Sequence, residues 1–181
     1  MPNENDVCCS GGAPGADLIW GEEATKYGHS VIHFTFRGHR TKAPKSQLVV
    51  LDENQLELAN EHVDKANKTL KRTWPVRDQF VGNLLRRDYY QVVMSDSLYA
   101  VSTFDQRGEI KGGTAWAIEM MKNLHPYGKI YLFDQKRNGW AQWKGGWFSI
   151  IKPPRPAGIY AGVGSRDLNS KGERAIREVF E

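Results

Sequence analysis

The chain has 181 residues, of which 40% are hydrophobic and 25% are charged. This length and composition are typical of one compact domain that needs neither a disulfide nor a metal to fold. The formal net charge of +4 is compatible with an anionic ligand, but it is too small to indicate nucleic-acid binding by itself. No apolar run approaches the roughly 20 residues of a membrane span, and the polar residues 1–6 lack the apolar segment of a signal peptide.

The only cysteines, Cys8 and Cys9, are adjacent and lie in an apolar stretch. Neighbouring cysteines rarely form a disulfide, so we expect both thiols to be reduced and buried. Together with the missing membrane and secretion signals, this predicts a soluble, cytoplasmic protein with a single domain over residues 1–181.

The first third of the chain predicts two strands around one helix. A short apolar run, residues 7–9, ends at the glycine-rich segment 10–17. A helix to about residue 27 follows, with Leu18, Ile19 and Ala24 facing inward. The β-branched and apolar residues 31–36, between Gly28 and Gly38, predict a strand that leads into a basic loop.

Two helices are expected in the middle of the chain. Apolar residues at spacings of three and four predict one amphipathic helix over residues 52–72. Trp74-Pro75 ends this helix, and a second one covers residues 77–93.

The last part of the chain again alternates strands with helices. Strands are expected over residues 97–103, 129–133 and 159–163, with one helix from Thr114 to Leu124 and a final helix that follows the turn Gly164-Ser-Arg166 and reaches Glu181. A small tryptophan-rich hairpin is expected over about residues 139–151. Its Trp140, Trp143 and Trp147 are typical of side chains that cover a sheet edge or a subunit contact.

This alternation predicts an α/β fold, a Rossmann-like parallel sheet with helices on both faces. The ends of the chain are unusual, because the first strand is short while a complete strand-loop-helix unit stands last. If the two ends were joined, Arg166 would precede Ser10 by about 25 residues, which suits a βαβ crossover. We therefore expect a circular permutation, with residues 159–163 inside the sheet beside residues 7–9.

Three glycine-rich turns follow strands and would meet at the carboxyl edge of the sheet, where open α/β sheets bind ligands. The candidate residues for binding a phosphate there are Ser10, Gly11, Gly12, Ala13 and Gly15 in the first turn, Gly112, Gly113 and Thr114 in the second, and Gly164, Ser165 and Arg166 in the third. Glycines allow backbone N–H groups to approach an anion, and helix N-termini favour it electrostatically.

Each turn also has a purely structural interpretation. The first turn could simply join a strand to a helix, with Asp17 favoured by the helix dipole. Thr114 could cap its helix, and Arg166 could be a surface side chain paired with Asp167 or Glu173. Arg87 and Gln91, one helical turn apart, could face the same site or belong to a solvated basic face that includes Arg86.

Other polar residues give weaker signals. Arg37 and Arg40 are better explained as an ordinary basic loop. The five histidines show no metal-ligand spacing, so no metal is expected, and no cofactor is predicted beyond a nucleotide-like ligand.

The motif Gly164-Ser-Arg166 after one strand and Ser10-Gly-Gly-x-x-Gly-Ala-Asp17 after the next resembles the SLOG superfamily, which includes DprA-type proteins, LOG phosphoribohydrolases and YpsA-like proteins. Arg87-Asp-Tyr-Tyr-Gln-Val92 is similar to the Arg-Asn-x-x-Gln-Val element of some members, with Asp88 in place of Asn. Ile110-Lys-Gly-Gly-Thr114 is similar to the second glycine signature. The order of the motifs resembles the circularly permuted YpsA branch, once described as molybdenum cofactor carriers.

The resemblance implies a fold that binds nucleotides or their derivatives, and some members cleave the N-glycosidic bond of nucleoside monophosphates. Those hydrolases carry Pro-Gly-Gly-x-Gly-Thr-x-x-Glu, whereas here position 117 is Ala and the nearest glutamate is Glu119. The remaining candidates for a catalytic carboxylate are Asp17 and Glu119. We therefore expect nucleotide binding as the main function, as a sensor, carrier or weak processing protein, with N-glycosidase activity as the alternative. DNA binding of the DprA kind is a lesser alternative, and a homo-oligomer is compatible with the sequence.

Overall fold

The computed structural model describes residues 5–181, so residues 1–4 of the polar start lie outside it. Eight strands form one sheet in the order β3-β2-β1-β8-β4-β5-β6-β7. The first six of these pair in parallel, whereas β6 pairs antiparallel with both β5 and β7. In chain order the strands are β1 (Val7–Ser10), β2 (Ser30–Phe36), β3 (Leu48–Leu51), β4 (Ser97–Ser102), β5 (Lys129–Asp134), β6 (Gly139–Trp143), β7 (Trp147–Ile150) and β8 (Ile159–Gly164).

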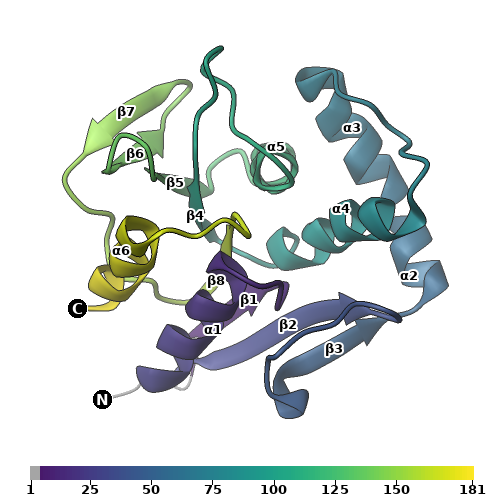
Figure 1. Cartoon of the computed structure of the whole chain (residues 1–181), viewed down its shortest axis with the longest axis horizontal. Helices are drawn as coiled ribbons and strands as arrows, with labels where there is room; N and C mark the ends of the chain where they lie inside the picture. Colours follow the sequence, from purple (N-terminus) through teal and green to yellow (C-terminus); the bar gives the residue numbers. More distant parts are fainter. Residues whose placement is uncertain (1–4) are drawn as a thin grey trace.

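Helices cover both faces of the sheet, as the sequence predicts. Figure 1 shows α1 (Ala16–Lys26) and α6 (Ser170–Phe180) on one side, and α4 (Gln79–Val92) and α5 (Thr114–Leu124) on the other. The short α2 (Glu53–Leu58) packs against α4, and α3 (Asn60–Leu70) against α5. Cys8 and Cys9 are fully buried and contribute to hydrophobic clusters on opposite faces.

Strand β8, the last in sequence, lies inside the sheet. It pairs in parallel with β1, where Val7 faces Ile159, and with β4, where Ser97 faces Tyr160. The predicted neighbourhood of residues 7–9 and 159–163 is confirmed. From β8 the strands β1, β2 and β3 extend to one side, and β4 to β7 extend to the other.

Three details of the predicted elements are wrong. The single helix over residues 52–72 is two helices that meet at Ala59, where hydrogen bonds Ala59 N–H to Leu56 O and His62 N–H to Ala59 O tighten the backbone. Strand β3 was missed because it has only four residues and exposes Val49 and Val50. Helix α1 buries Trp20 rather than Leu18.

The tryptophan hairpin, β6 and β7, extends the sheet beyond β5. Trp140 is buried against Phe133 with ring centroids 5.4 Å apart. The ammonium group of Lys122 in α5 lies 3.5 Å from the ring centroid of Trp143. The hairpin therefore covers a sheet edge, one of the two roles expected from its sequence. Within residues 5–181, none of the helices combines the length and apolar character that crossing a bilayer requires.

The position of β8 predicts the effect of a truncation. Deleting residues 157–181 should abolish cooperative folding, because β1 and β4 would lose the strand between them and α1 would lose its partner α6. Thermal unfolding followed by circular dichroism checks this. A soluble truncated protein with a cooperative transition would contradict it.

Candidate functional site

A cleft of about 370 Å³ opens at the carboxyl edge of the sheet, beside β8. At β8 the strand order reverses, with β1 on one side and β4 on the other. Crevices at such a reversal of strand order are the usual ligand sites of open α/β sheets. The lining residues come from four segments: Ala13 and Asp17 after β1; Val81, Leu84, Leu85, Arg87, Asp88 and Gln91 on α4; Lys111, Gly112, Gly113, Thr114 and Ala117 at the start of α5; and Val163 to Asp167 at the end of β8 and beyond.

The cleft has an exposed rim and a buried floor. The rim consists of Lys111, Gly112, Gly113, Arg166 and Asp167, all exposed. The floor consists of Asp17, Arg87, Asp88 and Gln91, whose exposed fractions are 4, 5, 7 and 1%.

The first glycine turn supports the third. Gly15 has φ 95°, and a Cβ there would lie 2.5 Å from the carbonyl oxygen of Ser165. Ala16 N–H donates to that same carbonyl at 3.1 Å. Because only glycine permits this crossing of two backbones, residue 15 fixes the position of the Ser165–Arg166 segment on the rim.

Arg87 joins the elements at the floor. Its Nη1 donates to the Gly11 carbonyl at 2.8 Å and lies 3.3 Å from Nε2 of His39. Its Nη2 lies 3.9 Å from Oδ2 of Asp17 and 3.9 Å from Oδ1 of Asp88. One guanidinium group therefore stands between two carboxyl groups.

Two buried donors at the floor have no hydrogen-bond partner within residues 5–181: Nε of Arg87 and Nε2 of Gln91. Gly11 lies directly against both side chains, since a Cβ there would be 2.1 Å from Nε2 of Gln91 and 2.6 Å from Cζ of Arg87. Buried polar groups are nearly always paired. Both side chains line the cleft, so its floor holds unpaired donors beside the Gly11 backbone.

Burial shifts the pKa values of the ionisable side chains at and beside the floor of the cleft. Desolvation raises the pKa of Asp17 to about 6, although Arg87 and the N–H groups of the first turn act in the opposite direction. Desolvation raises the pKa of Asp88 further, to about 8, against the influence of Arg87 and with that of Asp17. Burial and the charges of Arg87 and Arg166 lower the pKa of His39 to about 4, so its imidazole is neutral beside Arg87.

Most of the binding residues expected from the sequence come together on the cleft: Ala13, Arg87, Gln91, Gly112, Gly113, Thr114, Gly164, Ser165 and Arg166, together with Asp17. The others lie behind it. The Ser10 hydroxyl donates to the Gly162 carbonyl at 2.5 Å, and the Gly12 carbonyl accepts from Thr41 at 2.6 Å. Ser10, Gly11, Gly12 and Gly15 therefore shape the site without lining it.

Glu119, the other expected catalytic carboxylate, is not in this cleft. It lines a separate cavity of about 180 Å³ with Arg72 and Trp147, and its Oε1 lies 2.7 Å from Nζ of Lys122. Five residues after Thr114 is more than one helical turn, which directs the side chain away from the rim.

Some structural interpretations are also wrong. Thr114 does not cap α5, because the N-cap is Gly113 and no side chain bonds there. Arg87 is not part of a solvated face. Within residues 5–181 Arg166 forms no ion pair, and Glu173 pairs with Arg177 instead.

Three lining residues are not among the site residues expected from the sequence: Asp88, Lys111 and Asp167. Each is adjacent to a predicted one, so their position in sequence was the available signal. The apolar wall, Val81, Leu84, Leu85, Ala117 and Val163, carries no polar signal at all. No cluster of three or more potential metal ligands is found within residues 5–181.

No family model, curated protein or solved structure matches the chain.

The raised pKa of Asp88 predicts a pH-dependent stability. A carboxyl group that binds its proton more tightly when folded stabilises the protein most below its unfolded pKa near 4. This stability is lost as the pH rises toward 8. Asp88→Asn should therefore become increasingly more stable than the wild type between pH 5 and 8, by up to about 1.4 kcal/mol per pH unit. Urea unfolding at several pH values measures the difference, and a difference that is constant with pH would contradict the prediction.

Proposed function

We propose that the cleft binds a nucleotide or nucleotide-derived ligand through its phosphate, in a sensor, carrier or weak processing role. The observation that carries this proposal is that turns after three neighbouring strands and a helix N-terminus line one cleft that contains unpaired buried donors. The cleft volume of about 370 Å³ falls in the range of small-molecule sites.

The N-terminus of α5 is the proposed phosphate position. Within residues 5–181, the N–H groups of Gly113 and Thr114 donate to no backbone carbonyl, and the positive end of the helix dipole lies at the same point. Lys111 and Arg166 add two exposed cations to the rim, and neither forms an ion pair within the described residues. A guanidinium group can hold phosphate through two parallel hydrogen bonds.

The SLOG resemblance and the circular permutation belong to this proposal. If β8 is counted as the first strand and the edge strand β3 is set aside, the parallel strands have the order 3-2-1-4-5, which is that of a Rossmann sheet. The motifs Gly164-Ser-Arg166 and Gly112-Gly113-Thr114 then flank the point where the order reverses, where such folds bind nucleotides. DNA binding is less well supported, because Asp17, Asp88 and Asp167 lie among the cations of the cleft.

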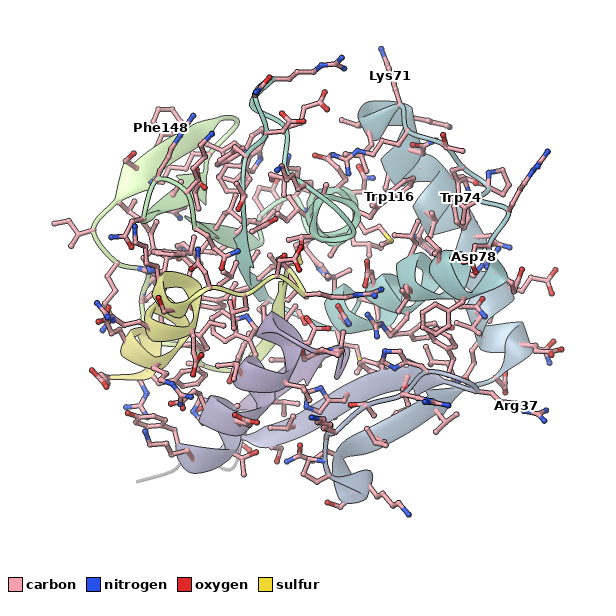
Figure 2. The ribbon with its side chains drawn as sticks, in the orientation of Figure 1. Arg37, Lys71, Trp74, Asp78, Trp116 and Phe148 are labelled. Atoms are coloured by element: carbon pink, nitrogen blue, oxygen red, sulfur yellow. The ribbon has the colours of Figure 1, made fainter. Side chains whose placement is uncertain are left out.

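A matched pair of variants tests the proposal. AMP at 100 times its Kd should stabilise the wild type by about 2.7 kcal/mol in a thermal-shift assay. Arg166→Ala should weaken AMP binding by about tenfold through loss of the phosphate contact. Arg37→Ala makes the same change in charge at a residue that points into solvent at the edge of the molecule (Figure 2), and should leave the affinity unchanged.

If AMP, GMP, CMP, UMP and the dinucleotide NAD all fail to stabilise the wild type, the cleft is not a nucleotide site. Equal losses of affinity in the two variants would show that only the overall charge matters.

N-glycosidase activity on nucleoside monophosphates is the second candidate. It is favoured by the place of Asp17, a carboxyl group at the floor of the cleft with a pKa of about 6. A carboxylate near the anomeric carbon can stabilise the oxocarbenium-like transition state of glycoside cleavage. The phosphate contacts of the rim would hold the reacting bond beside it.

Release of free base from AMP tests this second candidate. If the wild type is a hydrolase, Asp17→Asn should reduce its turnover by at least about a hundredfold. Glu119→Gln is the control, because its side chain lies in the other cavity. Turnover that survives Asp17→Asn would place the catalytic group elsewhere, and no turnover in the wild type would leave binding as the function.

A further inference from the structure

The charges of the cleft differ between its rim and its floor. The rim carries Lys111, Arg166 and the positive end of α5, against one exposed carboxylate, Asp167. At the floor, Asp17 and Asp88 flank the single cation Arg87. A phosphate dianion is therefore stabilised at the rim, whereas at the floor it would lie beside the Asp17 carboxylate.

The polar side chains at the floor of the cleft can pair with a group that both donates and accepts hydrogen bonds. Nε of Arg87 and Nε2 of Gln91 are buried donors with no acceptor within residues 5–181. The Asp88 carboxyl is 7% exposed and accepts no hydrogen bond within residues 5–181, and Nη2 of Arg87 lies 3.9 Å from its Oδ1. Hydroxyl groups are small, neutral and able to do both.

The rim and this carboxyl group are close enough to share one ligand. A Cβ placed on Gly113, at the start of α5, would lie 3.7 Å from Oδ2 of Asp88. A sugar phosphate with its phosphate on the helix N-terminus can therefore extend its hydroxyl groups toward Asp88.

We propose that the floor of the cleft binds the ribose hydroxyl groups of the ligand, and that Asp88 determines a preference for ribose over 2-deoxyribose phosphates. This inference rests on the proposed function and names the substrate class of the same site. Because burial raises the pKa of Asp88 to about 8, the carboxyl group keeps its proton at pH 7. It can then donate to one hydroxyl oxygen and accept from another. An analogue that lacks the 2-hydroxyl group would leave buried polar groups unpaired, which is costly.

Isothermal titration calorimetry at pH 7 tests the inference with two matched pairs of probes: AMP with 2′-deoxyAMP, and ribose 5-phosphate with 2-deoxyribose 5-phosphate. In each pair the wild type should bind the ribose compound at least about tenfold more tightly. Asp88→Ala should reduce this ratio to near one by weakening the ribose compound, with little change for the deoxy compound. Asp88→Asn, which keeps a donor and an acceptor, should retain most of the ratio.

Asp167→Ala is the control, because it removes a carboxyl group from the rim of the same cleft and should leave the ratio unchanged. A wild type that binds AMP and 2′-deoxyAMP equally overturns this inference and leaves the proposed function standing. The same holds if AMP binds and neither sugar phosphate does, since the floor would then recognise the base. A wild type that binds none of the probes overturns both.

Discussion

Arg87 imposes the constraint around which the carboxyl edge of this sheet is arranged. A guanidinium group keeps its charge at every relevant pH, so burying it to 5% exposure costs several kcal/mol unless neighbouring groups compensate. The compensation comes from the Gly11 carbonyl after β1 and from the Asp17 carboxylate on α1, while the protonated Asp88 carboxyl on α4 adds a neutral polar neighbour. The neutral imidazole of His39, after β2, accepts a second contact from Nη1, and Nε of Arg87 has no hydrogen-bond partner within residues 5–181. One buried charge thus holds together segments that are far apart in sequence.

The architecture determines what surrounds this charge. Because β8 lies between β1 and β4, the turn after β8 and the turn before α5 both line the cleft. The helix N-terminus and the exposed cations Lys111 and Arg166 are then at the rim, and the ion pair of Arg87 with Asp17 is beneath them. The rim of the cleft therefore favours an anionic group, whereas its floor favours neutral polar groups.

Much of this arrangement follows from the sequence, because glycine turns and strand patterns leave a clear signal. The crossing at Gly15 requires a positive φ, and the apolar run of residues 159–163 before a glycine turn predicts a strand inside the sheet. The local sequence pattern did not predict two features of the backbone, the break between α2 and α3 and the strand β3. The interruption at Ala59 breaks no apolar period, and the short strand β3 has no alternation to detect.

The division of the site into lining and supporting residues was not predictable in the same way. Gly11 and Ser10 belong to the same motif as Ala13, yet only Ala13 faces the cleft. The difference depends on long-range contacts, such as the Ser10 hydroxyl with the Gly162 carbonyl, that no local spacing encodes. The importance of Asp88 likewise arises from its burial beside another carboxyl group, which only the packing of α4 against the first turn reveals.

The most direct test of this account is a titration of the ¹⁵N-labelled protein with AMP, followed through the backbone amide signals. The account predicts that the largest shifts occur at Gly113 and Thr114, at the start of α5, and at Ser165 on the opposite side of the cleft. Shifts centred instead on Glu119 and Trp147, which line the other cavity, would contradict it, as would an unchanged spectrum.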